Sequence, residues 1–176
     1  MSYLSVNDTG EIQKTIDLRP ISESGLEEWK SSASGLQRRW LEDSGFKASA
    51  GECCALPNED GAVEAWLFGQ GEKGSLYQLA SLVGRLPAGT YRLDCDWSRE
   101  QRLQASLGWG LACYRFDRYK ENKNPLPGLL LDGDIESEVR ALCQAQCLVR
   151  DLVNTPTEDM GPAQLADAVT READRF

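Results

Sequence analysis

The stretch AVEAWLFGQGEKGSLYQLASLVGRLPAGTYRLDCDW, residues 62–97, decides the fold class. Residues 62–68 are rich in apolar side chains and predict a strand. Apolar residues at helical spacing then predict a helix over 75–86, and Pro87-Ala88-Gly89 breaks it before a second strand at 90–97. A strand, a helix and another strand in this order predict an α/β protein.

The residues before this stretch predict one more strand and one more helix. Residues 14–22 alternate between polar and apolar side chains, and Pro20 places this strand at a sheet edge or at its own end. The helix that follows ends at Gly45, a typical C-terminal stop, and Gly35 weakens its middle. Its apolar stripe consists of Leu26, Trp29, Ala33, Leu36 and Trp40.

A β-hairpin is predicted around residues 57–61. This segment, PNEDG, has the composition of a turn, and residues 46–56 and 62–68 on either side of it both read as strands. Hairpin strands pair antiparallel, whereas strands joined through a helix can pair in parallel. The sheet is therefore predicted to be mixed.

The residues after 97 predict two long helices with a short strand, residues 129–131, between them. Ser98 is a good N-cap for the first helix, and Asp134 is the predicted cap of the second. The second helix has about 20 residues and a length of roughly 30 Å, enough to join two domains. Its apolar stripe consists of Ile135, Val139, Leu142, Val149 and Val153. Together these elements predict a three-layer α/β/α sandwich with a mixed sheet, followed by a linker helix.

The composition of the chain limits which binding partners and which cellular location we expect. The 176 residues carry a formal net charge of −9 with scattered Lys and Arg, which argues against nucleic acid as a partner. No apolar run approaches the ~18 residues of a membrane span, and the start of the chain, MSYLSVNDTGEIQK, lacks the features of a secretory signal. We expect a cytoplasmic protein with no membrane partner.

The metal-ligating residue types do not form a convincing site. The six cysteines include Cys143 and Cys147 at i, i+4 spacing, but no C-x-x-C occurs and the chain has no histidine, so buried thiols are favoured over zinc. The acidic run 132–138 lacks the Gly and Glu that a calcium loop needs at its sixth and twelfth positions. The lack of histidine also excludes a Ser-His-Asp triad and a Cys-His pair within these residues.

One glycine motif suggests nucleotide binding. Gly69, Gly71 and Gly74 form a G-x-G-x-x-G pattern between a predicted strand and a predicted helix, and Asp94 ends the next strand where a ribose-binding acid would lie. The motif follows a hairpin strand, however, and Glu72 places a negative charge where phosphates would bind. A plain strand-to-helix loop is therefore favoured, and a nucleotide or ADP-ribose binding module is the alternative.

Two further stretches carry a resemblance to a known family. RDLVNTP, residues 150–156, followed by a short acidic segment and a helix predicted to start at Gly161-Pro162, resembles the domain junction of the leucyl (cytosol) aminopeptidases, with its R-[DN]-L-x-N-x-P pattern. GWGLACYRFDRY, residues 108–119, resembles the G-W-x-L-x-x-Y-x-F-x-x-Y helix of the same family. The resemblance covers most of the chain from about residue 40 onward.

The resemblance implies a division into parts. It implies an N-terminal α/β domain similar to macro domains at residues 1–133, a linker helix and junction at 134–156, and the first turns of a catalytic domain at 157–176. The complete family members are metalloaminopeptidases with two divalent metals, Zn, Mn or Mg, that remove N-terminal residues from peptides, and they are commonly hexamers.

The catalytic residues of that family have no counterpart here. The family's metal ligands lie in a segment like N-T-D-A-E-G-R, and no such segment occurs in this sequence. We therefore assign no catalytic residue and no metal ligand to this chain, expect no cofactor in it, and expect it to be inactive by itself. Its expected partners are its own catalytic domain and further copies of the same chain.

Overall fold

The computed structural model describes residues 4–5, 14–71, 75–120, 122 and 124–175. Within them lies one six-stranded sheet with the strand order β1-β6-β5-β2-β4-β3. Every neighbouring pair is parallel except β3 and β4, which form the antiparallel hairpin. The strands are β1 (Leu4–Ser5), β2 (Thr15–Ile21), β3 (Cys53–Pro57), β4 (Val63–Gly69), β5 (Thr90–Leu93) and β6 (Gly128–Leu130). The predicted mixed sheet of an α/β protein is confirmed.

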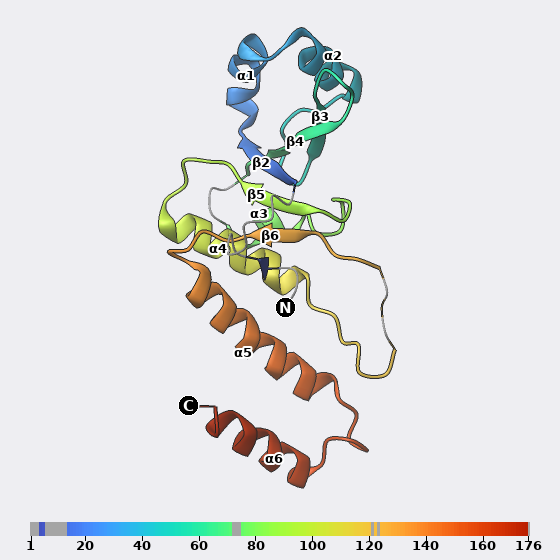
Figure 1. Ribbon diagram of the computed structural model, residues 1–176, viewed down its shortest axis with the longest axis vertical. Helices are drawn as coiled ribbons and strands as arrows, with labels where there is room; N and C mark the ends of the chain where they lie inside the picture. Colours follow the sequence, from blue (N-terminus) through green and yellow to red (C-terminus); the bar gives the residue numbers. More distant parts are fainter. Residues whose placement is uncertain (1–3, 6–13, 72–74, 121, 123, 176) are drawn as a thin grey trace.

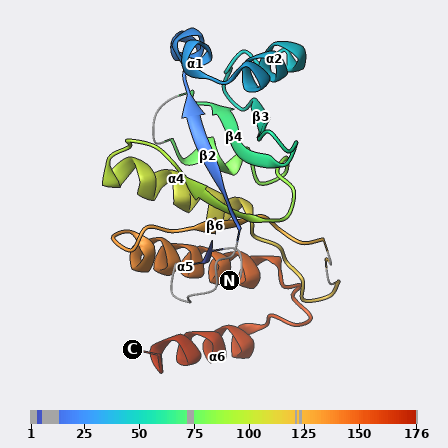
Figure 2. The same ribbon diagram turned by 45° about the horizontal axis from the view of Figure 1, so that its top comes forward.

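The helices lie toward opposite ends of the molecule. Figures 1 and 2 show α1 and α2 at one end, α4 beside the middle of the sheet, and α5 and α6 at the other end.

A short 3-10 turn, η1 (Glu23–Gly25), precedes α1. The helices are α1 (Leu26–Ser32), α2 (Gly35–Ser44), α3 (Leu76–Ala80), α4 (Arg99–Ala112), α5 (Glu136–Asn154) and α6 (Pro162–Ala173).

Strand β4 contributes to two separate cores because its successive side chains point to opposite faces of the sheet. Ala65 and Leu67 lie in a core with residues of α1 and α2. Phe68 lies in the larger core with residues of α3, α4 and the start of α5. The sheet is thus the middle of the predicted three layers. The likeness to macro domains stays a prediction.

The sequence Gly108-Trp109-Gly110 explains how closely the helices pack on α4. Trp109 is fully buried in the larger core. A Cβ atom on Gly108 would lie 1.7 Å from the carbonyl oxygen of Leu76, and one on Gly110 would lie 2.3 Å from Sγ of Cys143. Only glycine therefore permits α3 and α5 to approach α4 on these two sides.

In the larger core, the beginning of the chain also packs against the start of α5. Leu4 of β1 and Ile135, Val139 and Cys143 around the start of α5 are all buried in it. The guanidinium of Arg140 donates a hydrogen bond of 2.8 Å to the carbonyl oxygen of Leu4. The first half of α5 is therefore packed as part of the α/β unit.

The predicted single helix before Gly45 is wrong, because the chain breaks at Ala33 and restarts as α2. Ser34 has an extended backbone, and its side chain accepts a hydrogen bond from the backbone N–H of Gln37. A serine cap followed by glycine favours such a restart over a continuous helix. Gly45 does end α2 as predicted, with a left-handed φ of 67°.

Several predicted boundaries differ from the observed ones. The strand predicted over 46–56 begins only at Cys53. The carboxylate of Glu52 accepts backbone hydrogen bonds from Lys47 and Ser49 and folds the preceding residues into a compact loop. The helix predicted over 75–86 is regular only in α3, and the strand predicted over 90–97 ends at Leu93.

The helix starts were predicted with mixed success. Ser98 forms a complete capping box with Gln101 at the start of α4, and Pro162 occupies the first turn of α6, both as predicted. Asp134 does not cap α5, however, because the capping position is Ile135 and no side chain caps it. The carboxylate of Asp134 instead binds an arginine on α4.

Candidate functional site at the junction of α4, α5 and α6

The glycines of the nucleotide-binding alternative lie at the carboxyl end of β4. A Cβ atom on Gly69 would lie 1.9 Å from the carbonyl oxygen of Ser49, so this glycine is needed for the packing of the 46–52 loop. Gly71 has a left-handed φ of 50°, and Gly74 lies outside the described residues. Packing alone therefore explains the glycine at position 69.

Asp94 lies apart from these glycines. It follows β5, and β2 separates β5 from β4 in the sheet. Its carboxylate forms an ion pair of 2.9 Å with Nε of Arg19, and Nη2 of the same guanidinium lies 3.3 Å from the carboxylate of Asp17. The structure therefore places a cation against the predicted ribose-binding acid and does not bring Asp94 together with Gly69 and Gly71.

Gln70, which no sequence pattern singled out, lies between two cavities at the carboxyl ends of β2 and β4. Its side chain is buried, and its Nε2 atom has no hydrogen-bond partner among the described residues. One cavity, about 550 Å³, is lined by Ile21, Trp29 and Gln70 among others, and the second, about 270 Å³, by Gly69, Gln70 and Tyr77 among others. Such a buried amide is a hydrogen-bond donor available to a bound water or ligand.

The six cysteines form no disulfide bond with one another, and no metal site is found in the described part of the chain. No group of three or more His, Cys, Asp or Glu side chains could hold a metal there. Burial raises the pKa of Cys113 to about 12 and that of Cys143 to about 11. Both are therefore neutral, unreactive thiols at physiological pH.

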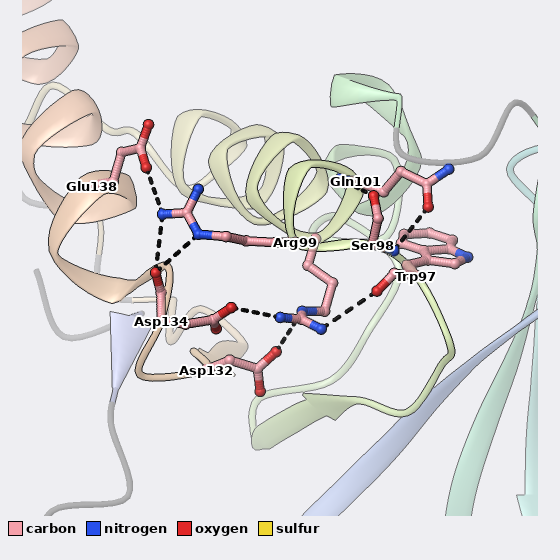
Figure 3. A network of polar contacts seen from close by, with 8 residues as sticks. Trp97, Ser98, Arg99, Gln101, Asp132, Asp134 and Glu138 are labelled. Carbon is pink, nitrogen blue, oxygen red and sulfur yellow. Dashed lines mark hydrogen bonds and ion pairs between the residues drawn. The ribbon is translucent and has the colours of Figure 1, made fainter.

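Arg99, at the start of α4, holds the beginning of α5 (Figure 3). Its guanidinium donates a hydrogen bond of 2.8 Å to the carboxylate of Glu138 and another of 3.0 Å to the carbonyl oxygen of Asp134. Both partners are exposed to solvent, so the contacts contribute more to orientation than to stability.

Arg102 binds the residues between β6 and α5 from the next turn of α4. Its side chain forms ion pairs of 2.9 Å with Asp132 and 2.8 Å with Asp134, and it donates a hydrogen bond to the carbonyl oxygen of Trp97. In the sequence, the two arginines at i, i+3 spacing and the acidic run 132–138 were the signal from which these ion pairs could have been predicted. We name Arg99, Arg102, Asp132, Asp134 and Glu138 the arginine clamp.

A second polar network lies at the far end of α5. The hydroxyl of Tyr114 donates a hydrogen bond of 2.8 Å to Asp151 and accepts one of 3.0 Å from the amide of Asn154. Arg150 donates to the carbonyl oxygen of Leu111 and stacks over the Tyr114 ring. The two family-like stretches, 108–119 and 150–156, thus contact each other directly. Desolvation and the bond to Asp151 raise the pKa of Tyr114.

The same network continues past the end of α5. Arg118 donates to the hydroxyl of Thr155, which is buried and itself donates a hydrogen bond of 2.6 Å to the carbonyl oxygen of Asp151. The hydroxyl of Tyr119 donates to the carboxylate of Asp159, and this bond raises the pKa of Tyr119. Residues 114–119 therefore hold the turn between α5 and α6.

Apolar side chains on the last part of α5 and on α6 are exposed. Figures 1 and 2 show α6 running alongside α5 at one end of the molecule. Val153 is 78% exposed and Val169 is 64% exposed, which is unusual for residues in an apolar stripe. We name these residues the exposed stripe: Leu142, Val149, Val153, Leu165 and Val169.

The described helices do not include one with both the length and the apolar character that crossing a membrane requires.

Comparisons with known proteins identify the family. Residues 16–132 match the N-terminal domain of the M17 aminopeptidases. The chain is 29% identical over 171 residues to a probable cytosol aminopeptidase of Tropheryma whipplei, and the match covers 80% of this chain and 34% of that protein. It is 31% identical over 153 residues to a probable cytosol aminopeptidase of Chromohalobacter salexigens, covering 80% of this chain and 28% of that protein. The chain thus spans about a third of the length of these relatives.

Solved structures give the same result. The crystal structure of the cytosol aminopeptidase from Coxiella burnetii superposes with a TM-score of 0.91 at 29% identity, covering 100% of this chain and 38% of that one. The bottromycin maturation enzyme BotP, solved in complex with Mn, superposes with a TM-score of 0.68 at 26% identity, covering 91% of this chain and 36% of that one. The resemblance predicted from residues 108–119 and 150–156 is confirmed. The chain belongs to the M17 aminopeptidase family and contains its N-terminal domain.

Proposed function

We propose that this chain is the non-catalytic N-terminal part of a metal-dependent leucyl aminopeptidase-like enzyme that removes N-terminal residues from peptides in the cytoplasm. The observation that carries the proposal is the superposition of the whole chain on 38% of the Coxiella burnetii cytosol aminopeptidase. The remaining part of such an enzyme would hold the catalytic residues. This chain would shape access to the active site and contribute to assembly.

The metals of this enzyme would belong to the catalytic domain. BotP was solved with Mn, and two divalent cations, Zn, Mn or Mg, are proposed for the complete enzyme. The described residues of this chain do not fit such a centre, because they contain no cluster of three or more potential ligands. Two bridged cations need several converging carboxylates. We therefore derive no catalytic step from these residues.

The exposed stripe is the proposed contact surface for the catalytic domain. Val149 and Val153 on α5 and Leu165 and Val169 on α6 are each about half exposed or more. Apolar side chains that are gathered on neighbouring helices gain free energy when a partner removes them from water. The rest of the catalytic domain, following α6, would be tethered beside this surface. Further copies of the chain, in a hexamer, are the second proposed partner.

A test of the proposal compares two chain lengths on a leucine-linked chromogenic substrate with Mn or Zn added. The 176-residue chain should show no turnover, because it carries no metal-ligand set among its described residues. A chain extended through the catalytic domain should hydrolyse the substrate. Turnover by the purified 176-residue chain that a chelator abolishes would contradict the proposal.

Nucleotide binding is the second candidate function. It is supported by the cavity of about 270 Å³ next to Gly69, Gly71 and the buried amide of Gln70. Calorimetric titration of the chain with NAD and with ADP-ribose tests it, and Gln70→Leu is the matched variant. Micromolar binding that the variant weakens would favour this function, and heat changes no larger than those of dilution would reject it.

A further inference from the structure

The last part of α5 is held differently from its first part. Val139 and Cys143 are buried in the core, but they are the only buried residues of this helix. From Gln144 to Asn154 the helix continues for roughly 16 Å at ~1.5 Å per residue. Of its large apolar side chains in that part, Val149 and Val153 face solvent, whereas Leu148 and Leu152 are half-buried. Beside this partial burial, polar contacts hold this end of the helix.

Apart from the bond between Arg150 and the carbonyl oxygen of Leu111, those contacts come from one short segment, residues 114–119 after α4. Tyr114 binds the last turn of α5 through both Asp151 and Asn154, so its hydroxyl is used as a donor and as an acceptor. Arg118 and Tyr119 reach beyond the helix to Thr155 and Asp159. The segment thus contacts the chain both before and after the point where α5 ends.

The contacts also support one another. The ring of Tyr119 lies against Phe116, with ring centroids 5.8 Å apart, and the guanidinium of Arg118 lies 5.7 Å from the centre of the Tyr119 ring. Thr155 is 7% exposed, and both its backbone N–H and its hydroxyl donate to the carbonyl oxygen of Asp151. A turn whose cap residue is buried and whose flanks are bonded on both sides has little freedom to change direction.

We propose that residues 114–119 form a brace that fixes the turn Thr155–Asp159, so that the chain leaves α5 in one direction. Tyr114, Arg118 and Tyr119 are its positioning residues, and the partner that they orient is α6 with whatever follows it. The joint between the α/β unit and the next part of the protein is then rigid. This inference concerns the 176-residue chain itself and stands apart from the aminopeptidase proposal.

Residual dipolar couplings of backbone amides in a weakly aligned sample test the direction of α6 relative to α4. In the natural chain the couplings of both helices should fit one alignment tensor. In the double variant Tyr114→Phe/Tyr119→Phe the couplings of α6 should shrink toward zero while those of α4 keep their values. Phenylalanine retains both rings and removes only the two hydroxyls, so the variant isolates the hydrogen bonds.

Tyr77→Phe is the matched control, because Tyr77 is 77% exposed and lies on α3, and it should leave every coupling unchanged. Hydrogen exchange of residues 150–160 is the second measurement, and the double variant should exchange about tenfold faster there, as the loss of three exposed hydrogen bonds implies. Averaged couplings of α6 in the natural chain would overturn the brace. So would couplings and exchange rates that the double variant leaves unchanged.

Discussion

Helices α4 and α6 are similar in length and differ in what covers them. α4 has 14 residues, of which Leu103, Ala105, Ser106, Gly108, Trp109 and Gly110 are buried. α6 has 12 residues, of which only Ala168 is buried. An isolated helix of this length is marginal in water, because most helical stability comes from packing. The apolar residues of α6 thus lie in the surface proposed to contact a partner, whereas those of α4 build the core.

The largest expected effect is the difference in the free energy of unfolding that is lost when an apolar side chain is truncated on α4 and on α6. Trp109→Ala should lower the free energy of unfolding by about 3–5 kcal/mol, because the indole is fully buried in the larger core. Val169→Ala, the control on α6, should change it by less than about 0.5 kcal/mol. Urea denaturation followed by circular dichroism measures both. Equal losses would mean that α6 is packed as firmly as α4.

Hydrogen exchange sharpens the same comparison without a substitution. Amides of α6 should exchange at least about a hundredfold faster than those of α4, because local opening of α6 exposes little buried surface. The measurement is mass spectrometry of peptides from the two helices. Strong protection of residues 157–176 in a demonstrated monomer would place them in the first unit, and the predicted boundary after residue 156 would have to move.

The reactivity of the thiols gives a third difference, between the larger core and the more exposed part of α5. Cys113 and Cys143 are no more than 1% exposed, and burial raises the pKa of each, to about 12 and about 11. A bulky thiol reagent should therefore modify them only on unfolding, but should modify the less buried Cys147 in the native state. Peptide mapping after brief labelling gives the order of reaction.

The same thiols predict a dependence of stability on pH. Their pKa values are higher in the folded chain than the ordinary 9.0, so the folded state retains these protons at pH values where the unfolded chain loses them. Their contribution is fully present below pH 9.0 and decreases as the pH rises toward 11–12. Cys113→Ala should weaken this alkaline decrease in urea titrations, and an unchanged slope would contradict the assignment.

The smallest expected effect comes from the arginine clamp. Arg102→Met keeps the aliphatic stem and removes two ion pairs, and the side chain is 24% exposed, so the loss should be about 1 kcal/mol. Arg171→Met on α6 is the control and should cost nothing measurable. The measurement is the melting temperature of each variant relative to the natural chain, in low salt and in 1 M salt. The loss caused by Arg102→Met should shrink in 1 M salt, because screening weakens the ion pairs of the clamp in the natural chain.

Local signals predicted the parts of the fold that depend on local chemistry. The turn at 57–61, the capping box at Ser98 and the start of α6 at Pro162 each involve residues no more than a few positions apart. The break at Ala33 has a local cause as well, but the regular apolar spacing across it favoured one helix. β1 has two residues, too few to form a pattern, and exists because β6 and Arg140 bind it.

Contacts between distant residues could not be predicted in the same way. Asp134 has the sequence context of a helix cap, yet its partner Arg102 lies 32 positions away. Gly69 fits a phosphate-binding pattern, yet the carbonyl oxygen of Ser49 occupies the space beside it. The brace joins Tyr114 to Asp151 across 37 positions. Its two halves were noticed as separate family-like stretches, and only the structure places them in contact.

The buried contact between Leu4 and the start of α5 bears on how this protein can be shortened. The family match ends at residue 132, but the larger core also contains Leu4, Ile135, Val139 and Cys143. A fragment trimmed to residues 16–132 would lack these four side chains and leave the surface around Gly110 open to water. We expect such a fragment to aggregate on expression. We therefore expect the smallest autonomous folding unit to reach at least from Leu4 to Cys143, beyond both limits of the sequence match.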